Sequence, residues 1–547
     1  MRRRKPKFLT LPGPHFFAAA AALAVFLGFG FLLIPYPGIE NDEALFSGGI
    51  YAPGGMEWSV RLFGEQIAMM IMSYVGALKA WLYAPVLALW GPSPWSLRLP
   101  VLLAGALTVF LFYRLLARAA GRGAALIGCA LLATDASFLL TATFDWGPVA
   151  IQQLLLVSGL LLLVSFHQGG GERRLAAGCF LLGLGLWDKA IFAWVLSGVT
   201  GAALILYWRE FWRQVTPKRV ALAGFAFALG ASPFLAYNLT HSFETFHGKR
   251  YGFDALRQKL AVLHYTVRGD AMYGFLVDYG SGKERRPESA MERAAVRLSE
   301  LTGRRTTNWL LWMIAAGLAA GVWMAGAGAW RPVLFFPLAW LLAWLQMLVT
   351  VEAGGSAHHI VLLWPFLIGA AALPLGMAMK RLPRAGAWGV IALTLAVAGS
   401  NVLVLNEYLA GLARYGPARM WTDAVYPLAA YLERARPGIV YAADWGMGDT
   451  LRFYLKDQTP LGNAIEPFFR KELDERESGQ IIARVSHPGS VFVSYTGGWD
   501  MFPQAKKLVQ ECAAAAGYRR ETLQLIRDRQ GRAVFEIYRF LPPENEP

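Results

Sequence analysis

Charged side chains are scarce in this chain of 547 residues. Asp, Glu, Lys and Arg together make up 16% of the sequence, whereas hydrophobic residues make up 56% and the mean hydropathy is +0.38. An ordinary soluble domain has about 25% charged residues. This composition therefore excludes a soluble domain as the whole chain and indicates a membrane protein with several spans.

Cysteine is also rare, with three residues in the chain. Cys129 and Cys179 fall inside apolar runs, and Cys512 stands alone near the C-terminus. No two of them have the spacing of a CxxC pair. The sequence therefore excludes a disulfide framework and a structural zinc site built on cysteine.

Positive charge exceeds negative charge, and the formal net charge is +15. The Lys and Arg residues stand in short clusters between apolar runs, which is the positive-inside pattern of membrane proteins and does not indicate a nucleic-acid partner. The first cluster, at residues 2–7, precedes an uncharged apolar run at 16–34, and PYPG follows in place of a small-residue cleavage site. We expect an uncleaved first span with a cytoplasmic N-terminus.

The apolar runs predict about eleven spans within a membrane domain at residues 1–405, with outer-face loops at 36–99 and 238–305. Residues 57–94 mix charge, Met, Trp and Pro, so we expect interfacial or re-entrant helices there. Beyond residue 405 the composition becomes that of a soluble domain. Runs at 438–444, 490–496 and 533–540 predict strands of a small extracytoplasmic α/β domain at 406–547.

One apolar segment, residues 175–208, is interrupted by Asp188 and Lys189 and has basic clusters at both ends. Basic flanks at both ends imply two crossings, and two helices of about 15 residues are too short for a core about 30 Å thick. The tip of this hairpin is therefore expected below the outer surface, where charges must face a protein-lined cavity. The alternative is that Asp188 and Lys189 only pair with each other.

Two acidic turns are expected on the outer face. The first, PYPGIENDEALFSGGIY at residues 35–51, carries Asp42 and Glu43, and the second, TATFDWGP, carries Asp145. Repulsion between neighbouring carboxylates and partial burial both favour the protonated form, which suits a carboxylate that accepts a proton. The alternatives are a solvated loop or a helix N-cap at the first turn and a helix cap at the second.

These turns lie in stretches that resemble a known family. Residues 31–51, 90–148 and 173–190 resemble the membrane region of GT-C glycosyltransferases, specifically the protein O-mannosyltransferase type and the bacterial aminoarabinose lipid A transferases of the family 39 type. The resemblance extends over roughly residues 16–405. Two departures are SYVGALKAWLYAP at 73–85, where the family has a Pro-Pro-Leu-like element, and Asp188-Lys189-Ala190, where relatives have Thr-Lys-Gly.

The resemblance implies a glycosyltransferase that moves a hexosyl or pentosyl group, with inversion, from a polyprenyl-phosphate-linked donor to a lipid, glycan or protein acceptor. It implies that Asp42 is the general base and Asp145 a second site carboxylate, while Glu43 either orients the acceptor or faces away. The leaving phosphate needs a cation. The candidates are Lys79 and Lys189, followed by Arg61 and Arg98, for which anchoring at the headgroups is the alternative.

His358 and His359 begin the expected span at 360–379 in a pattern that also resembles the family. The favoured interpretation is a pair of interfacial histidines with neither role, and the alternative places them at the pocket, in contact with phosphate or a metal. A divalent cation held by Asp42 and Asp145 stays open, because hard cations take carboxylate oxygens. The sequence establishes no cofactor.

A second functional class is a transporter or flippase of a lipid-linked or amphipathic substrate, in which an intramembrane charge such as Asp188 marks the substrate path. Transporters often have repeats between their halves, and we find none in this sequence. The acidic residues also stand at the outer ends of helices rather than at the midplane. We therefore expect an enzyme, in the bacterial inner membrane, with its C-terminal domain outside the cytoplasm.

Overall fold

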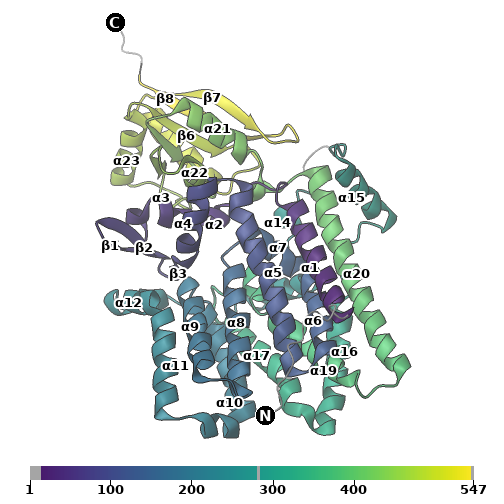
Figure 1. Cartoon of the computed structure of the whole chain (residues 1–547). Coiled ribbons are helices and arrows are strands. Elements are labelled where there is room, and N and C mark those ends of the chain that lie inside the picture. The colour runs from purple at the N-terminus through teal and green to yellow at the C-terminus, as the bar shows by residue number, and fades with distance from the viewer. Residues whose placement is uncertain (1–13, 280–283, 544–547) are drawn as a thin grey trace.

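The computed structural model describes residues 14–279 and 284–543, so the basic cluster at residues 2–7 lies outside the described part. Long helices form one end of the molecule, and a mixed sheet with its own helices forms the other (Figure 1). Short elements between them, including the helix α2 (Asn41–Ala44), carry the first acidic turn. The prediction of a polytopic helical membrane protein with a C-terminal α/β domain is confirmed.

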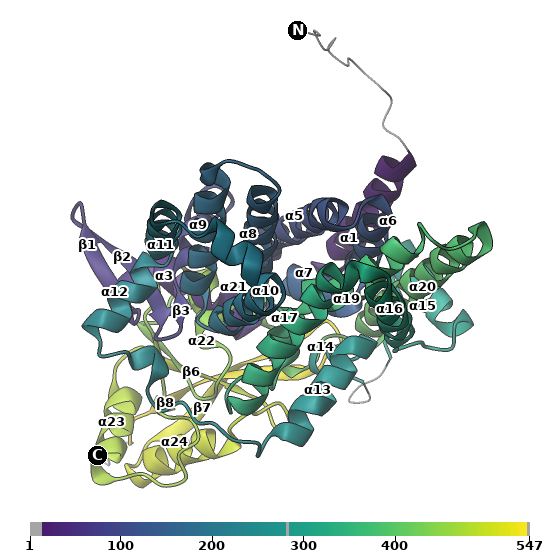
Figure 2. The ribbon, with the colours of Figure 1, turned by 90° about the horizontal axis from the view of Figure 1, so that it is seen from below.

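Six helical stretches in the described part of the chain are long and apolar enough to cross a membrane: α1 (Pro14–Leu33), α5 (Pro94–Ala119), α8 (Ala150–His167), α10 (Phe192–Gln214), α20 (Arg384–Tyr415) and the stretch formed by α16 (Leu310–Met324) and α17 (Trp330–Val349). Two bent pairs bring this number to as many as eight: α6 (Arg122–Thr134) with α7 (Ala136–Phe144), and α11 (Pro217–Gly230) with α12 (Ser232–Thr240). Two further expected spans correspond to the shorter helices α9 (Glu172–Asp188) and α19 (Trp364–Ala378). Seen from below, α9 and α11 lie towards one side of this layer and α20 at the other (Figure 2).

The hairpin at 175–208 differs from its expected dimensions. Its helices α9 and α10 have 17 and 23 residues, rather than two of about 15, because α10 continues past Trp208 to Gln214 with a kink at Tyr207. The tip between them is buried and pairs with the short strand β3 (Val75–Gly76). Val75 and Lys189 form a β-bridge, and the Ala190 N–H donates to the Tyr74 carbonyl at 2.9 Å.

The first outer loop contains a small sheet where we expected only helices. The strands β1 (Trp58–Leu62), β2 (Glu65–Met72) and β3 pair in antiparallel order. Phe63 and Gly64, with φ of 52° and 88°, form the turn between β1 and β2, and two consecutive positive φ values match the right-handed twist of a hairpin. The expectation was therefore wrong for residues 58–76, and it holds only for the following helix α4 (Leu78–Trp90).

The second outer loop is partly helical and includes α13 (Leu256–Arg268), α14 (Tyr273–Leu276) and α15 (Ala290–Leu301). Lys259 on α13 is buried, and its ammonium donates to the carbonyls of Met347, Leu348 and Thr350 at the end of α17. These carbonyls have no partner within the helix, so the Lys259 contacts satisfy them. The loop is thereby fixed to the membrane helices.

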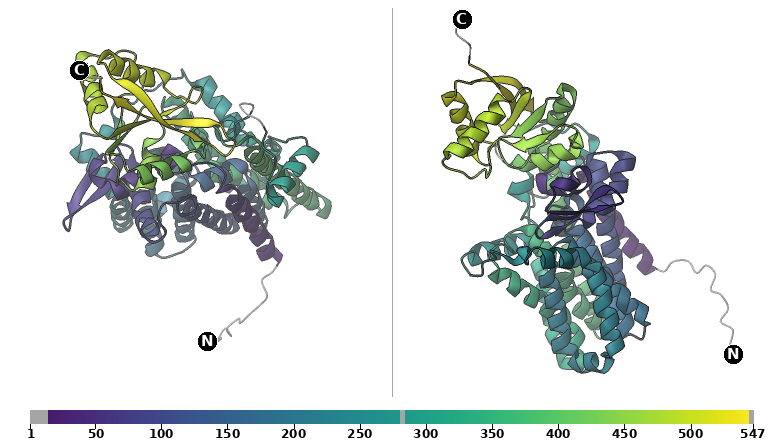
Figure 3. Two further views of the ribbon diagram at one scale, coloured as in Figure 1. Left: turned by 90° about the horizontal axis from the view of Figure 1, so that it is seen from above. Right: turned by 90° about the vertical axis from the view of Figure 1, so that its left-hand side faces the viewer.

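The C-terminal domain has a five-stranded sheet in the order β5-β4-β6-β8-β7. The three expected strands are β4 (Ile439–Ala442), β6 (Ser490–Tyr495) and β8 (Ala533–Leu541), whereas β5 (Leu461–Asn463) and β7 (Arg519–Arg527) were not expected. Its helices are α21 (Val425–Ala435), α22 (Gly448–Leu455), α23 (Glu475–Ser486) and α24 (Pro503–Ala515). The side view in Figure 3 shows the first outer loop between this domain and the long helices.

Candidate active site

The first acidic turn is organised by Glu40, which the sequence did not single out. The Glu40 carboxylate accepts hydrogen bonds from the backbone N–H groups of Asp42 at 2.8 Å and Glu43 at 3.3 Å, and the Glu43 carboxylate accepts from the Glu40 N–H at 3.4 Å. This reciprocal arrangement is a capping box at the start of α2. Because Glu40 is the cap, the half-buried Asp42 carboxylate is not used for capping.

Glu43 and Arg98 of α5 also hold the turn in place. The Arg98 guanidinium donates to both Glu43 carboxylate oxygens, at 2.7 and 2.8 Å, and to the carbonyls of Ile34, Pro37 and Gly38. Both side chains are fully buried. These contacts use the hydrogen-bonding capacity of Arg98, so its geometry favours a structural role over the expected contact with phosphate.

Asp145 follows α7 in a left-handed conformation, with φ of 45° and ψ of 38°. One carboxylate oxygen accepts from the N–H groups of Val149 and Ala150, at 2.9 and 3.0 Å, and so caps the start of α8. The other oxygen lies 2.8 Å from the ammonium of Lys79 on α4. Asp145 therefore has the expected capping contacts and also holds a buried cation from the first outer loop.

Lys189 brings the two acidic turns and the hairpin tip together. Its ammonium interacts electrostatically with Asp42, Asp188 and Asp145, and it makes no ion pair with any residue in the described ranges. Asp188 is almost fully buried, and neither of its carboxylate oxygens has a hydrogen-bond partner there. Asp188 and Lys189 are thus close to each other and to the rest of the cluster, without a direct ion pair.

The two histidines lie beside the second acidic turn. They belong to the short helix α18 (Ala357–Val361). The centroid of the His358 ring lies 4.5 Å from the centroid of the Trp146 ring and 4.2 Å from that of the His359 ring. The tight fit requires glycine at position 147, which has a φ of +66°. A Cβ atom there would be only 2.9 Å from the His358 ring.

The structure therefore brings most of the expected site residues into one cluster: Asp42, Lys79, Asp145, Asp188, Lys189, His358 and His359. Arg61 is not among them, because it is exposed on β1. Sequence reasoning missed Glu40 and Trp146, although both lie next to residues that it selected. The only signal in the sequence was their position within the motifs ENDE, at residues 40–43, and DWGP, at residues 145–148.

Burial raises the pKa of the Asp42 carboxyl above its ordinary value. The nearby ammonium of Lys189 and contacts with Trp146 and Asn41 oppose this effect without cancelling it. Burial and the negative charge of Asp42 raise the pKa of Glu40 well above its usual range. Asp42 is therefore a carboxylate with increased proton affinity, as a general base requires.

The cluster does not fit a resident metal ion. No group of three or more His, Cys, Asp or Glu side chains in the described part of the chain is arranged to bind one. Asp145 already accepts two backbone N–H groups and faces Lys79. We therefore derive no step that passes through a metal at Asp42 and Asp145.

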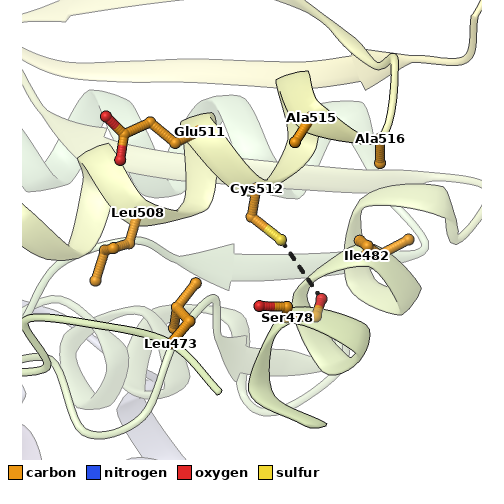
Figure 4. A pocket seen from close by; sticks show the side chains of 8 residues that line it. All are labelled: Leu473, Ser478, Ile482, Leu508, Glu511, Cys512, Ala515 and Ala516. Carbon is orange, nitrogen blue, oxygen red and sulfur yellow. Dashed lines mark hydrogen bonds between the residues drawn. The ribbon is translucent and has the colours of Figure 1, made fainter. Parts of the chain in front are cut away.

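Two cavities lie elsewhere. One of about 300 Å³ is between α23 and α24, where Cys512 donates to the Ser478 carbonyl beside Leu473 and Leu508 (Figure 4). Another of about 400 Å³ is lined by Tyr265, Asp270 and neighbouring residues of the second outer loop. Neither cavity includes a residue of the cluster.

Comparisons with known proteins show what this chain is similar to. Residues 76–237 match the model of the dolichyl-phosphate-mannose-protein mannosyltransferase family. ArnT from Cupriavidus metallidurans, solved bound to undecaprenyl phosphate, is 14% identical over 95% of this chain and 97% of its own, with a TM-score of 0.56. No curated protein matches the sequence.

Two further solved structures share the fold. Arabinofuranosyltransferase AftD from Mycobacteria is 17% identical over 98% of this chain and 40% of its own, with a TM-score of 0.51. The oligosaccharyltransferase of Archaeoglobus fulgidus is 12% identical over 96% and 74%, with a TM-score of 0.52. The family match covers residues 76–237, and the solved structures, each less than 25% identical to this chain, show that the chain shares their fold.

Proposed function

We propose that this protein transfers a sugar from a polyprenyl-phosphate-linked donor to an acceptor outside the cytoplasm. The observation that carries the proposal is the meeting of two acidic turns and the hairpin tip at Lys189, whose ammonium interacts with Asp42, Asp145 and Asp188. Carboxylates and a cation in one cluster provide the two charges that such a displacement needs. Undecaprenyl phosphate, found bound to ArnT, supports the choice of donor class.

Asp42 is the general base in this proposal. As the acceptor oxygen or nitrogen forms a bond to the anomeric carbon, the bond from that carbon to the phosphate oxygen breaks. The acceptor proton moves to the Asp42 carboxylate, and attack opposite the leaving group inverts the configuration. A positioned base contributes about 10² to 10⁴ in rate. The raised pKa of Asp42 suits this role, because it increases the affinity of the carboxylate for the proton.

Lys189 is the best candidate to stabilise the leaving phosphate. Negative charge builds on that phosphate as the bond breaks, and a cation already in place stabilises it without reorganisation. Lys79 is already paired with Asp145 at 2.8 Å, whereas Lys189 has no ion-pair partner in the described residues. We therefore propose that Lys79 and Asp145 maintain the structure of the site and that Lys189 binds the leaving phosphate.

Asp188 is the candidate for binding the sugar itself. A buried carboxylate is costly unless its oxygens accept hydrogen bonds, and both Asp188 oxygens have none from the described residues. Hydroxyl groups of a sugar ring are suitable donors for them. The transporter alternative explains a buried charge equally well, but it gives no role to the base-like environment of Asp42.

The test is chemical and identifies the product. Lipids and surface glycans from cells with and without this protein are compared by mass spectrometry, and the purified protein is incubated with polyprenyl-phosphate sugars and the acceptor identified in cells. We expect a product that gains the mass of one glycosyl unit and free polyprenyl phosphate in equal amount. Movement of the intact donor across vesicles without cleavage of its sugar–phosphate bond would favour the flippase instead.

A further inference from the structure

The first acidic turn is also held by the segment that follows α20. The Gly38 N–H donates to the Trp421 carbonyl at 2.6 Å, and the Tyr426 hydroxyl donates to the Pro37 carbonyl at 2.9 Å. Gly38 approaches the segment so closely that a Cβ atom would be 1.9 Å from the Thr422 carbonyl oxygen. The turn therefore has protein on two sides, with Arg98 on one and residues beyond α20 on the other.

The contact nearest to the proposed base is a reciprocal pair between Asn41 and Asp449. The Asn41 side-chain amide donates to the Asp449 carboxylate at 3.2 Å, and the Asp449 backbone N–H donates to the Asn41 amide oxygen at 3.0 Å. Arg452, one turn further along α22, lies 2.5 Å from the other Asp449 oxygen and fixes its orientation. The pair joins residues 408 positions apart in the chain.

We propose that Asp449 is a positioning residue, through which the C-terminal domain holds Asn41 and thereby the neighbouring Asp42 in register with Lys189. This inference rests on the proposed function. It assigns the C-terminal domain to the assembly of the site itself.

The physical reason is the small size of α2. This helix has four residues, and a helix of that length is not stable by itself, since nucleation is costly and few hydrogen bonds repay it. Its orientation must come from tertiary contacts. A displacement of about 1 Å in a catalytic group can cost about 10² in rate, so the loss of one such contact is expected to lower turnover more than donor binding.

Charge adds a second effect of Asp449 on Asp42. Burial raises the pKa of Asp449 to about 6, and repulsion between its carboxylate and that of Asp42 adds to this rise. By reciprocity the same repulsion favours the protonated form of Asp42. The other titratable groups that interact with Asp42 are Glu40, Lys189 and Tyr74.

The experiment exchanges the two groups of the pair. N41D places two carboxylates face to face, and we expect kcat to fall about tenfold or more with little change in KM for the donor. The double variant N41D/D449N restores one amide and one carboxylate in exchanged positions, and we expect it to regain most of that loss. D457N is the matched control, because Asp457 also pairs with Arg452, at 3.8 Å, but does not contact the turn.

Two further measurements make the result decisive. Thermal unfolding of the wild type, N41D, D449N and N41D/D449N forms a double-mutant cycle. It reports the coupling between positions 41 and 449 even without a turnover assay. In D449N the acidic limb of the kcat profile should move to lower pH, since a negative charge near Asp42 is lost. Coupling without rescue of turnover, or N41D with wild-type kcat, would overturn the proposal. If the wild-type protein itself transfers no sugar, the proposed function fails instead.

Discussion

The ammonium of Lys79 lies 2.8 Å from one carboxylate oxygen of Asp145, and both side chains are buried. This ion pair ties the first outer loop to the start of α8, because the second oxygen of Asp145 caps that helix. Lys79 also lies 4.6 Å from the centre of the Phe46 ring. Lys79 and Asp145, both candidates for contact with the substrates, thus pair with each other. We therefore expect substitution of Lys79 to have a different effect from substitution of Lys189.

We expect Lys189→Ala and Lys79→Ala to have different effects. Loss of Lys189 removes a cation that has no ion-pair partner among the described residues, so binding of sugar-free polyprenyl phosphate should weaken by about tenfold or more, as for a charged hydrogen bond worth about 1.5–3 kcal/mol. Loss of Lys79 leaves the buried Asp145 unpaired, which costs about 3–5 kcal/mol of stability. Ligand binding and thermal unfolding, measured on both variants, check this. Equal losses of binding at unchanged stability would contradict our assignment.

Glu43→Gln tests whether Glu43 is structural. The substitution removes the charge that faces Arg98, whose guanidinium is fully buried, so we expect a large loss of stability, of the order of a few kcal/mol, as for a broken buried ion pair. Thermal unfolding in detergent measures it, with the exposed Arg61→Ala as the control. A normal unfolding temperature together with a large drop in turnover would instead indicate direct contact with the acceptor.

The pH dependence of turnover should report the environment of Asp42. A general base works only when deprotonated, and burial raises its pKa, so the acidic limb of the profile should lie above the range of an ordinary Asp. The positive charge of Lys189 opposes that rise. Lys189→Gln should therefore move the acidic limb to higher pH. A shift to lower pH, or none, would mean that another group controls the limb.

Gly147→Ala tests the turn that carries Asp145. Position 147 has a φ of +66°, and an added Cβ would be 2.9 Å from the His358 ring, so both backbone strain and a clash are expected. We expect lower turnover and a lower unfolding temperature. Gly274→Ala is the matched control, because a Cβ there meets no atom within 4 Å. Wild-type behaviour of both variants would show that the turn tolerates displacement.

The sequence predicted what depends on local pattern. Uncharged runs predicted the membrane helices, because a membrane imposes its constraints over about 20 consecutive residues. The polar turns that follow two of these runs led to the choice of Asp42 and Asp145, and both residues interact with Lys189 in the structure. The hairpin at 58–72 was not predicted, because its turn at Phe63 and Gly64 lacks the usual Asn-Gly or Asp-Gly signal. β7 was not predicted either, because it is an edge strand whose side chains are mostly polar.

Pairings between distant residues could not be predicted from the sequence. No local pattern near Arg98 indicates that its partner is Glu43. Because of this pairing, the geometry of Arg98 favours a structural role at the acidic turn over phosphate binding. Likewise, Asn41 and Asp449 meet only because the C-terminal domain folds back onto the first loop. Such contacts depend on tertiary packing, on which the local pattern of a single sequence has no bearing.

Asp42→Asn provides the most direct test of the central claim. The variant preserves the shape of the side chain and removes its ability to accept a proton, so we expect turnover to fall by about 10² to 10⁴ while the binding of polyprenyl phosphate and the unfolding temperature stay near wild type. Transfer at the wild-type rate by this variant would contradict the assignment of Asp42 as the base.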